Sequence, residues 1–307
     1  MDPADALQAR RLGQAFFALA GSTYVLVVLG ALVRAHGAGL ACPDWPLCFG
    51  EVIPEFDFKV AFEWGHRALA GGIGLVFAAL ALVCLRRPGL RKRMWIGLLV
   101  VAVILAVQIV LGGLTVLELL ASWTVTSHLV TGNAFALSLV LLARRFSALG
   151  TSHAVGDASA SPHVEHTALQ RAATTVAGLL LFFQIVVGGL VSSNYAGLVC
   201  PDWPTCMNGE FFPTWRGIQG LHVVHRTLGY ACVVAIGAAA WLSRAVPSTR
   251  AWLGVAAGLA ICQIGVGVAN VLLRLPVEVT GLHSALAAGL ICSVGISVRE
   301  AWRQASP

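Results

Sequence analysis

Eight long apolar runs constrain the fold of this 307-residue chain more than any other feature of its sequence. A transmembrane helix needs about 20 consecutive, mostly apolar residues. Runs of this kind lie at Ala15–Val33, Trp64–Leu85, Met94–Val116, Trp123–Leu142, Ala172–Val191, Leu221–Leu242, Ala251–Leu273 and Val279–Val298. Only 11% of the residues are charged, which is too few to cover a soluble protein of this length. The sequence therefore predicts an all-α, polytopic membrane protein with eight transmembrane helices.

The positive charges are distributed unevenly between the two ends of the predicted helices. With the N-terminus placed inside, fourteen Lys and Arg residues lie on the inner side and six on the outer side. An excess of this kind orients multi-pass proteins in the membrane. It predicts a cell membrane protein with both termini in the cytoplasm. It also accounts for the net charge of +6 without a nucleic-acid partner.

The sequence contains an internal duplication. Residues 30–48 and 188–206 are identical at twelve of nineteen positions. Gln108 and Gln263 are each followed by a histidine twenty residues later. A tandem repeat of a four-helix unit explains this pattern, and an even number of helices makes both copies point the same way through the membrane. We therefore expect two tandem four-helix bundles, in an N-terminal half (1–146) and a C-terminal half (171–307), joined by a cytoplasmic connector (147–170).

Four histidines recur at matching positions in the two halves, near the outer ends of alternate helices: His66, His128, His225 and His283. Ionisable side chains are costly inside a membrane and usually mark a functional site. Two imidazoles that face each other across a four-helix unit can bind a haem iron axially, whereas zinc would require further ligands. We expect one bis-histidine haem site in each half; the alternative is four buried histidines bonded to neighbouring helices. Three other histidines lie in the polar connector, where we expect them to be solvated: His153, His163 and His166.

Charged residues flank the first histidine of each pair. Arg67 and Arg226 are expected either to pair with haem propionates or to extend to the membrane interface. Glu63 lies three residues before His66, whereas His222 takes this position in the second half. Residues at i and i+3 share a helix face, so we expect Glu63 to face the haem pocket and to act in proton or cation chemistry. The alternative is an interfacial glutamate in contact with lipid headgroups or Arg67.

Two matching cysteine loops are predicted on the outer side of the membrane. They are Cys42-Pro-Asp-Trp-Pro-Leu-Cys48 and Cys200-Pro-Asp-Trp-Pro-Thr-Cys206. Thiols can stay oxidised outside the cell, and two prolines stiffen each spacer, so a closed disulfide loop is favoured over a metal site. One interpretation is a structural lid over each haem pocket, with the tryptophan as an apolar cover. The other is a redox-active pair in at least one half.

Taken together, these motifs resemble the haem A synthase family over essentially the whole chain. The resemblance rests on the two cysteine loops, on Glu63-Trp-Gly-His66-Arg67 and His225-Arg226, and on His128 and His283. It implies oxidation of the ring-D methyl group of haem O to a formyl group, through a hydroxymethyl intermediate. The product, haem A, would serve the biogenesis of haem-copper terminal oxidases.

The resemblance also implies roles for individual residues. His66 and His128 would bind the substrate haem, His225 and His283 would bind a resident haem b, and Glu63 would act in catalysis. Cys42 and Cys48 match the family's disulfide; the second pair, Cys200 and Cys206, need not occur in every member and is interpreted as structural. Expected partners are haem O, the lipid bilayer, an unidentified electron acceptor and the haem O synthase.

Two other functions are compatible with parts of the sequence. A dihaem b-type electron carrier explains the four paired histidines, but it does not explain the replacement of Glu63 by His222. An outer-face thiol-disulfide oxidase explains the cysteine loops, but it makes the histidines incidental. Assay with haem O separates the first alternative from a haem A synthase, and a haem spectrum separates the second.

Overall fold

The computed structural model describes residues 2–55, 57–151 and 165–303, and the regular structure in these ranges is helical. The α-helices are α1 (Pro3–Ala35), α2 (Phe58–Leu85), α3 (Pro88–Leu117), α4 (Ser122–Thr151), α5 (Ala168–Ser193), α6 (Gly217–Leu242), α7 (Pro247–Leu272) and α8 (Val277–Ala301), with a 3₁₀ turn, η1 (Ala196–Leu198), after α5. All eight α-helices are long and apolar enough to cross a membrane. The prediction of an all-α, polytopic membrane protein is confirmed.

Several helices extend beyond their apolar runs. α1 begins at Pro3, because the Asp2 side chain caps its amino end and proline suits the first turn of a helix. α4 continues to Thr151, and α5 starts at Ala168, where the Thr167 side chain caps it. Both ends of the predicted connector are therefore helical. Apolar residues mark the part of a helix that crosses the bilayer, whereas capping residues mark its ends.

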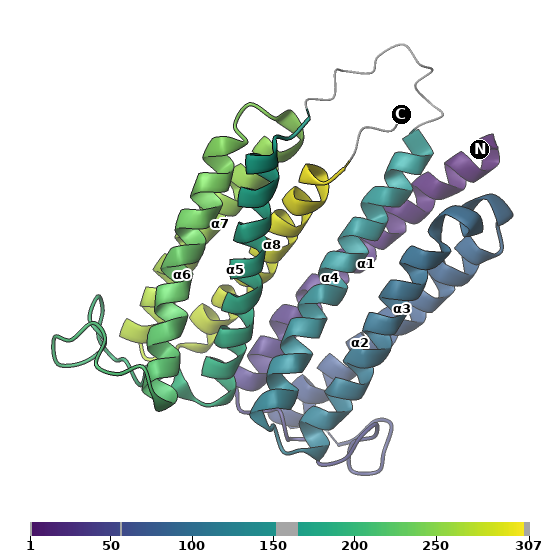
Figure 1. Ribbon diagram of the computed structural model, residues 1–307. Helices are drawn as coiled ribbons and strands as arrows, with labels where there is room; N and C mark the ends of the chain where they lie inside the picture. Colours follow the sequence, from purple (N-terminus) through teal and green to yellow (C-terminus); the bar gives the residue numbers. More distant parts are fainter. Residues whose placement is uncertain (1, 56, 152–164, 304–307) are drawn as a thin grey trace.

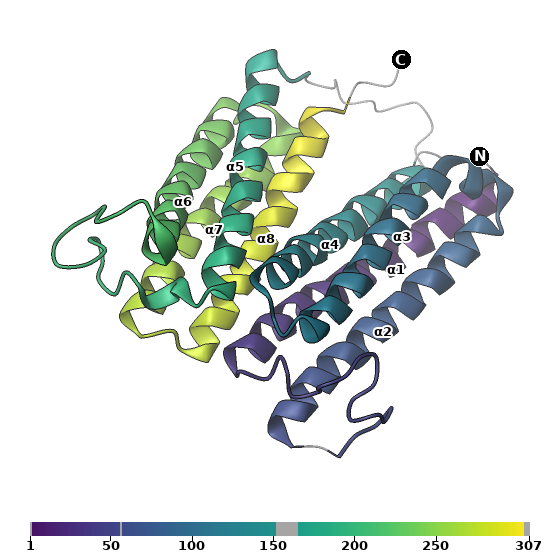
Figure 2. The same cartoon turned by 60° about the horizontal axis from the view of Figure 1, so that its bottom comes forward.

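The helices form two groups that lie side by side, α1–α4 and α5–α8 (Figures 1 and 2). Each group has its own cluster of buried apolar residues. α1, α4, α5 and α8 form the seam between the groups, since α1 packs on α8 and α4 packs on α5 and α8. Apolar packing inside each group positions the helices that carry the paired histidines.

The two cysteine loops lie at the end of the molecule opposite to the start of α1 and the end of α8 (Figure 1). Residues 36–57 join α1 to α2, and residues 194–216 join α5 to α6. Cys42 is disulfide-bonded to Cys48, and Cys200 to Cys206. α2, α4, α6 and α8 all begin at this end, so the loops and the paired histidines lie in the same region.

Candidate functional site

Each of the four paired histidines packs against a glycine on the preceding helix. A Cβ added to Gly30 of α1 would lie 3.0 Å from Cε1 of His66 on α2, which is closer than relaxed packing allows. The other pairs are Gly112 with His128 (3.0 Å), Gly188 with His225 (3.0 Å) and Gly267 with His283 (3.3 Å). Because glycine has no side chain, each imidazole can lie directly against the neighbouring backbone. We call these four contacts the glycine cradles.

The imidazoles come in two pairs, one in each group of helices. His66 and His128 lie on α2 and α4 of the first group, and His225 and His283 lie on α6 and α8 of the second. The Nδ1 atoms of His66, His128 and His283 are buried and make no hydrogen bond to any described residue. Buried polar atoms are nearly always hydrogen-bonded, so these nitrogens are suited to a group that is not part of the chain.

The donor set fits haem better than zinc. Within residues 2–55, 57–151 and 165–303, no three His, Cys, Asp or Glu side chains are grouped so that they could hold a metal ion. A structural zinc site needs four ligands, whereas a haem iron needs only two axial ones. Each group of helices thus supplies two imidazoles that lie directly against a glycine backbone, and two imidazoles fit the axial ligand set of a haem iron.

The two glutamines that mark the duplication lie beside the second histidine of each pair. Gln108 Nε2 is 3.3 Å from Nε2 of His128, and Gln263 Nε2 donates to the backbone carbonyl of His283 at 3.0 Å. The Oε1 atoms of both glutamines are buried and have no hydrogen-bond partner in the part of the chain that the structure describes. Their recurrence in the sequence thus marks polar groups next to the two candidate sites.

Gln184 of α5 lies beside His225 and was not among the predicted site residues. Its Nε2 is 3.2 Å from Nδ1 of His225, while its Oε1 is buried and has no partner within residues 2–55, 57–151 and 165–303. The oxygen and nitrogen of this amide are distinguished only by their hydrogen bonds. With the two exchanged, Oε1 accepts a hydrogen bond from Nδ1–H of His225. The Nε2 atom of the ring is then available to a metal. Leu26 takes the matching position of the duplication, so Nδ1 of His66 has no such partner among the described residues, and Gln184 could not be found from the repeat.

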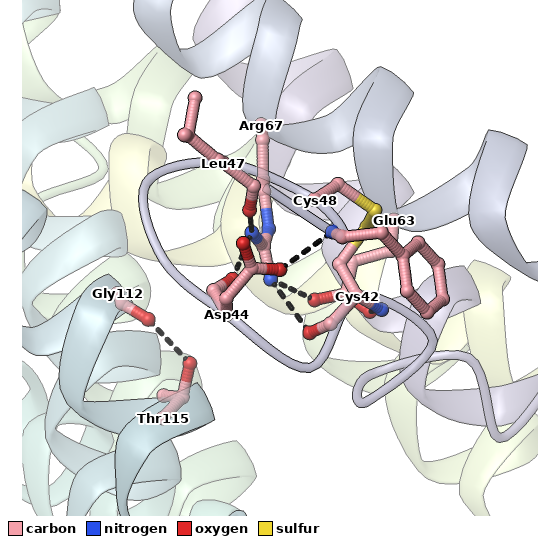
Figure 3. Close-up of polar contacts among 9 residues, drawn as sticks. Cys42, Asp44, Leu47, Cys48, Glu63, Arg67, Gly112 and Thr115 are labelled. Atoms are coloured by element: carbon pink, nitrogen blue, oxygen red, sulfur yellow. Dashed lines mark hydrogen bonds and ion pairs between the residues drawn. A yellow bond between two sulfur atoms is a disulfide. The ribbon is translucent and has the colours of Figure 1, made fainter. Parts of the chain in front are cut away.

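Glu63 is buried, with 4% of its surface exposed, and joins α2 to the first cysteine loop. It accepts hydrogen bonds from Nη2 of Arg67 at 2.6 Å and from the backbone N–H of Cys42 at 2.9 Å. Arg67 also donates to the carbonyls of Cys42, Asp44 and Leu47 (Figure 3). Of the two interfacial contacts considered for Glu63, the ion pair with Arg67 is the one formed, and both side chains hold the loop against α2.

Arg226 and His222 form the corresponding anchor in the second half. Arg226 donates to the carbonyls of Cys200 at 2.7 Å and Thr205 at 3.0 Å, and its Nε donates to Nε2 of His222 at 3.1 Å. Nδ1 of His222 in turn donates to the Ala196 carbonyl at 2.7 Å. A neutral histidine therefore takes the place of the carboxylate. The sequence did not predict that both arginines bind loop carbonyls, because such contacts depend on the backbone path and not on residue type.

The tryptophans of the two loops are held differently. The ring of Trp45 packs on α3, where a Cβ at Gly113 would lie 3.1 Å from it. Gly113 directly follows the glycine that cradles His128, so the first loop reaches the wall of the first candidate site. In the second loop, Nε1 of Trp203 donates to the Tyr230 hydroxyl of α6 at 3.1 Å. The first tryptophan thus rests on the third helix of its group, and the second is hydrogen-bonded to the second helix of its group.

Comparison with known proteins matches this arrangement to a family. The family model described as "Cytochrome oxidase assembly protein" matches residues 14–294, which include all four paired histidines and both cysteine loops. The chain belongs to this family. A protein named Heme A synthase from Shewanella oneidensis is 28% identical over 92% of this chain and 94% of its own length. Proteins of the same name from Caulobacter vibrioides (27% identical, 95% of both chains) and Halalkalibacterium halodurans (27% identical, 69% of both chains) also match.

Two of the remaining histidines in this cytochrome oxidase assembly family protein have structural contacts. His36 packs against the rings of Phe58 and Phe62, with centroids 5.1 and 4.9 Å apart. His166 is buried, and its Nε2 lies 3.1 Å from the Thr249 hydroxyl. The prediction that His166 is solvated was therefore wrong, because the segment just before α5 packs against the start of α7. Burial lowers the pKa of His166. The other two connector histidines, His153 and His163, lie outside the described residues.

Proposed function

We propose that the chain is a haem A synthase that oxidises the ring-D methyl group of haem O to a formyl group, through a hydroxymethyl intermediate, for haem-copper oxidase biogenesis. The observation that carries this proposal is the pair of imidazoles, each in a glycine cradle, that occurs once in each group of four helices. Relatives named Heme A synthase that align over nearly their full length support it. The conversion takes two successive two-electron oxidations at one carbon and adds one oxygen atom, so the enzyme must hold the substrate, pass electrons to an acceptor and admit an oxygen donor.

The two halves divide these tasks. His66 and His128 of the N-terminal half (1–146) would hold haem O, and His225 and His283 of the C-terminal half (171–307) would hold a resident haem b. When bound, haem b supplies reversible electron transfer. The amide of Gln184 supports this assignment. Its Nε2 lies 3.2 Å from Nδ1 of His225, whereas Leu26 occupies the matching position in the first half. A hydrogen-bonded ligand histidine holds its metal more tightly, as a permanent cofactor requires.

Glu63 is proposed as the catalytic carboxylate of the first half. It lies one helical turn from His66, and its negative charge is held in a buried ion pair with Arg67. A carboxylate held in a site of low dielectric stabilises positive charge that develops nearby, or takes up a proton at its oxygen. Arg67 is a positioning residue, since it fixes both the carboxylate and the loop above it.

The membrane setting follows from charge and thiol chemistry. The excess of Lys and Arg at one end of the helices favours cytoplasmic termini, and disulfides persist in the oxidising space outside the cell. The haem sites then lie toward the extracytoplasmic side of the cell membrane. Haem O would reach its site from the bilayer, with its hydrophobic tail among the lipid chains. The haem O synthase and an electron acceptor are the proposed protein partners.

The test is conversion of haem O by the purified protein. Haem O is added with an electron acceptor, and the extracted haem is analysed by mass spectrometry for the formyl product. We expect wild type to form haem A and Glu63→Gln to form it about a hundredfold more slowly. Glu55→Gln, which changes an exposed carboxylate of the same loop, is the matched control and should be unaffected. Stable haem binding by wild type with no formyl product would indicate an electron carrier instead.

A further inference from the structure

A cluster of arginines surrounds one glutamate at the end of the molecule opposite to the cysteine loops. Glu300 of α8 accepts bonds from Arg144 of α4 at 3.0 Å, from Arg299 at 3.3 Å and from Arg303 at 3.1 Å. The Glu300 side chain is only 5% exposed. The cluster therefore joins the two groups of helices at their seam, since α4 belongs to one group and α8 to the other.

The charges in this cluster do not balance. Three guanidinium groups face one carboxylate, which leaves two positive charges uncompensated within the cluster. The side chains of Arg299 and Arg303 are 25% and 53% exposed, so their guanidinium groups can be reached from outside the cluster. Positive charge gathered in this way is costly unless an anion lies nearby. The cluster thus has the donors and the charge to bind an anionic group.

A cavity of about 300 Å³ adjoins the cluster. Its walls include the three arginines, the hydroxyl-bearing residues Ser147 and Thr151, and the ring of Phe17 from α1. The lining therefore combines positive charge and hydroxyl groups with an apolar ring. This combination suits a phosphate group that is attached to a hydrocarbon chain. We call this cavity the arginine pocket.

We propose that the arginine pocket binds the phosphate of an anionic phospholipid headgroup. The pocket lies at the ends of membrane-spanning helices, where headgroups are found, and basic pockets between such helices are suited to anionic lipids. Its walls come from α1, α4 and α8, so a bound lipid would stabilise the seam between the two groups of helices. The inference does not depend on haem chemistry. It holds or fails independently of the proposed synthase activity.

The experiment measures lipid preference in the purified full-length protein. Its melting temperature and the lipid retained in native mass spectrometry are compared in micelles containing phosphatidylglycerol, in micelles containing phosphatidylcholine, and with inorganic phosphate. We expect phosphatidylglycerol alone to raise the melting temperature and to be retained. The double variant Arg299→Gln/Arg303→Gln keeps the Arg144–Glu300 pair, and its affinity should fall by about fivefold for each arginine.

The matched control is Arg86→Gln/Arg87→Gln, which removes the same charge from two exposed arginines on the α2–α3 turn. This control should keep the preference for phosphatidylglycerol, and an equal loss in both double variants would reject a built pocket. Full stabilisation by inorganic phosphate would reject a lipid ligand. If the pocket variant fails to fold, Glu300→Gln gives the opposite test. It adds net positive charge and should strengthen the preference for phosphatidylglycerol; an unchanged or weaker preference would overturn the proposal.

Discussion

The carboxylate of Glu63 and the guanidinium of Arg67 lie 2.6 Å apart beneath the first disulfide loop. This ion pair links two properties of the N-terminal half. It holds a negative charge one helical turn from His66, and it fixes the loop through the backbone N–H of Cys42. In the second half His222 holds the corresponding loop without a negative charge. A loop anchor is therefore common to both halves, whereas the buried charge belongs to the first alone.

Substitutions at Glu63 should separate its two roles. Glu63→Ala removes the partner of a buried arginine, so we expect the free energy of unfolding to fall by about 3 kcal/mol. Glu63→Gln keeps a hydrogen-bond acceptor and should cost about 1 kcal/mol, while conversion of haem O is lost to a similar extent in both variants. Thermal unfolding and haem analysis measure the two effects. Equal stability of the two variants would contradict the anchoring role.

The glycine cradles predict different losses in the two halves. Gly188→Ala places a methyl group 3.0 Å from the His225 ring, so the ring must move and resident haem should be lost. Gly30→Ala should leave resident haem in place but reduce conversion of haem O at least tenfold, because it displaces His66. Absorbance spectra of the purified variants measure haem retention.

Two other glycines supply matched controls for the cradles. Gly71 of α2 and Gly237 of α6 have no atom within 4 Å of an added Cβ. Gly71→Ala and Gly237→Ala should therefore leave haem retention and conversion unchanged. Haem loss in these controls equal to that in Gly188→Ala would show a general effect on the helices and would refute the cradles.

Much of this arrangement could be predicted from the sequence, and the reason lies in its periodic features. Apolar runs predicted all eight helices, and the duplication singled out the four paired histidines because they recur. The cradles could not be predicted, because which face of α1 meets α2 depends on packing of the whole bundle. Gln184 was missed because Leu26 replaces it in the other half. His166 was misassigned because a polar segment in the sequence still packs against α7.

Gln184 should tune the resident haem through His225. Gln184→Leu removes the polar partner of Nδ1, and we expect haem to dissociate about tenfold faster and its midpoint potential to rise. Gln184→Glu offers a stronger acceptor and should lower the potential relative to wild type. A redox titration with dissociation kinetics measures both effects. A structural role alone would leave the potential the same in all three proteins.

The first cysteine loop should weaken in acid through Asp44. The backbone N–H of Gly50, together with that of Phe49 and the charge of Arg67, holds the pKa of Asp44 below its usual value. A carboxylate whose pKa is lowered on folding stabilises the protein above its unfolded pKa, about 4, and this contribution is lost as the pH falls through the lower, folded value. Between about pH 5 and about pH 3, the range around the ordinary carboxyl pKa, the melting temperature of Asp44→Asn should therefore drop less than that of wild type. An identical pH profile in wild type and variant would exclude this contribution.

Haem content is the most direct test of the paired-histidine sites. The protein is purified from haem-replete cells, and its pyridine haemochrome spectrum is compared with those of His66→Ala and His225→Ala. We expect a b-type haem with two axial histidines in wild type and in His66→Ala, and its loss in His225→Ala. Colourless wild-type protein that takes up no haem on reconstitution, or haem retained in full by His225→Ala, would contradict the assignment.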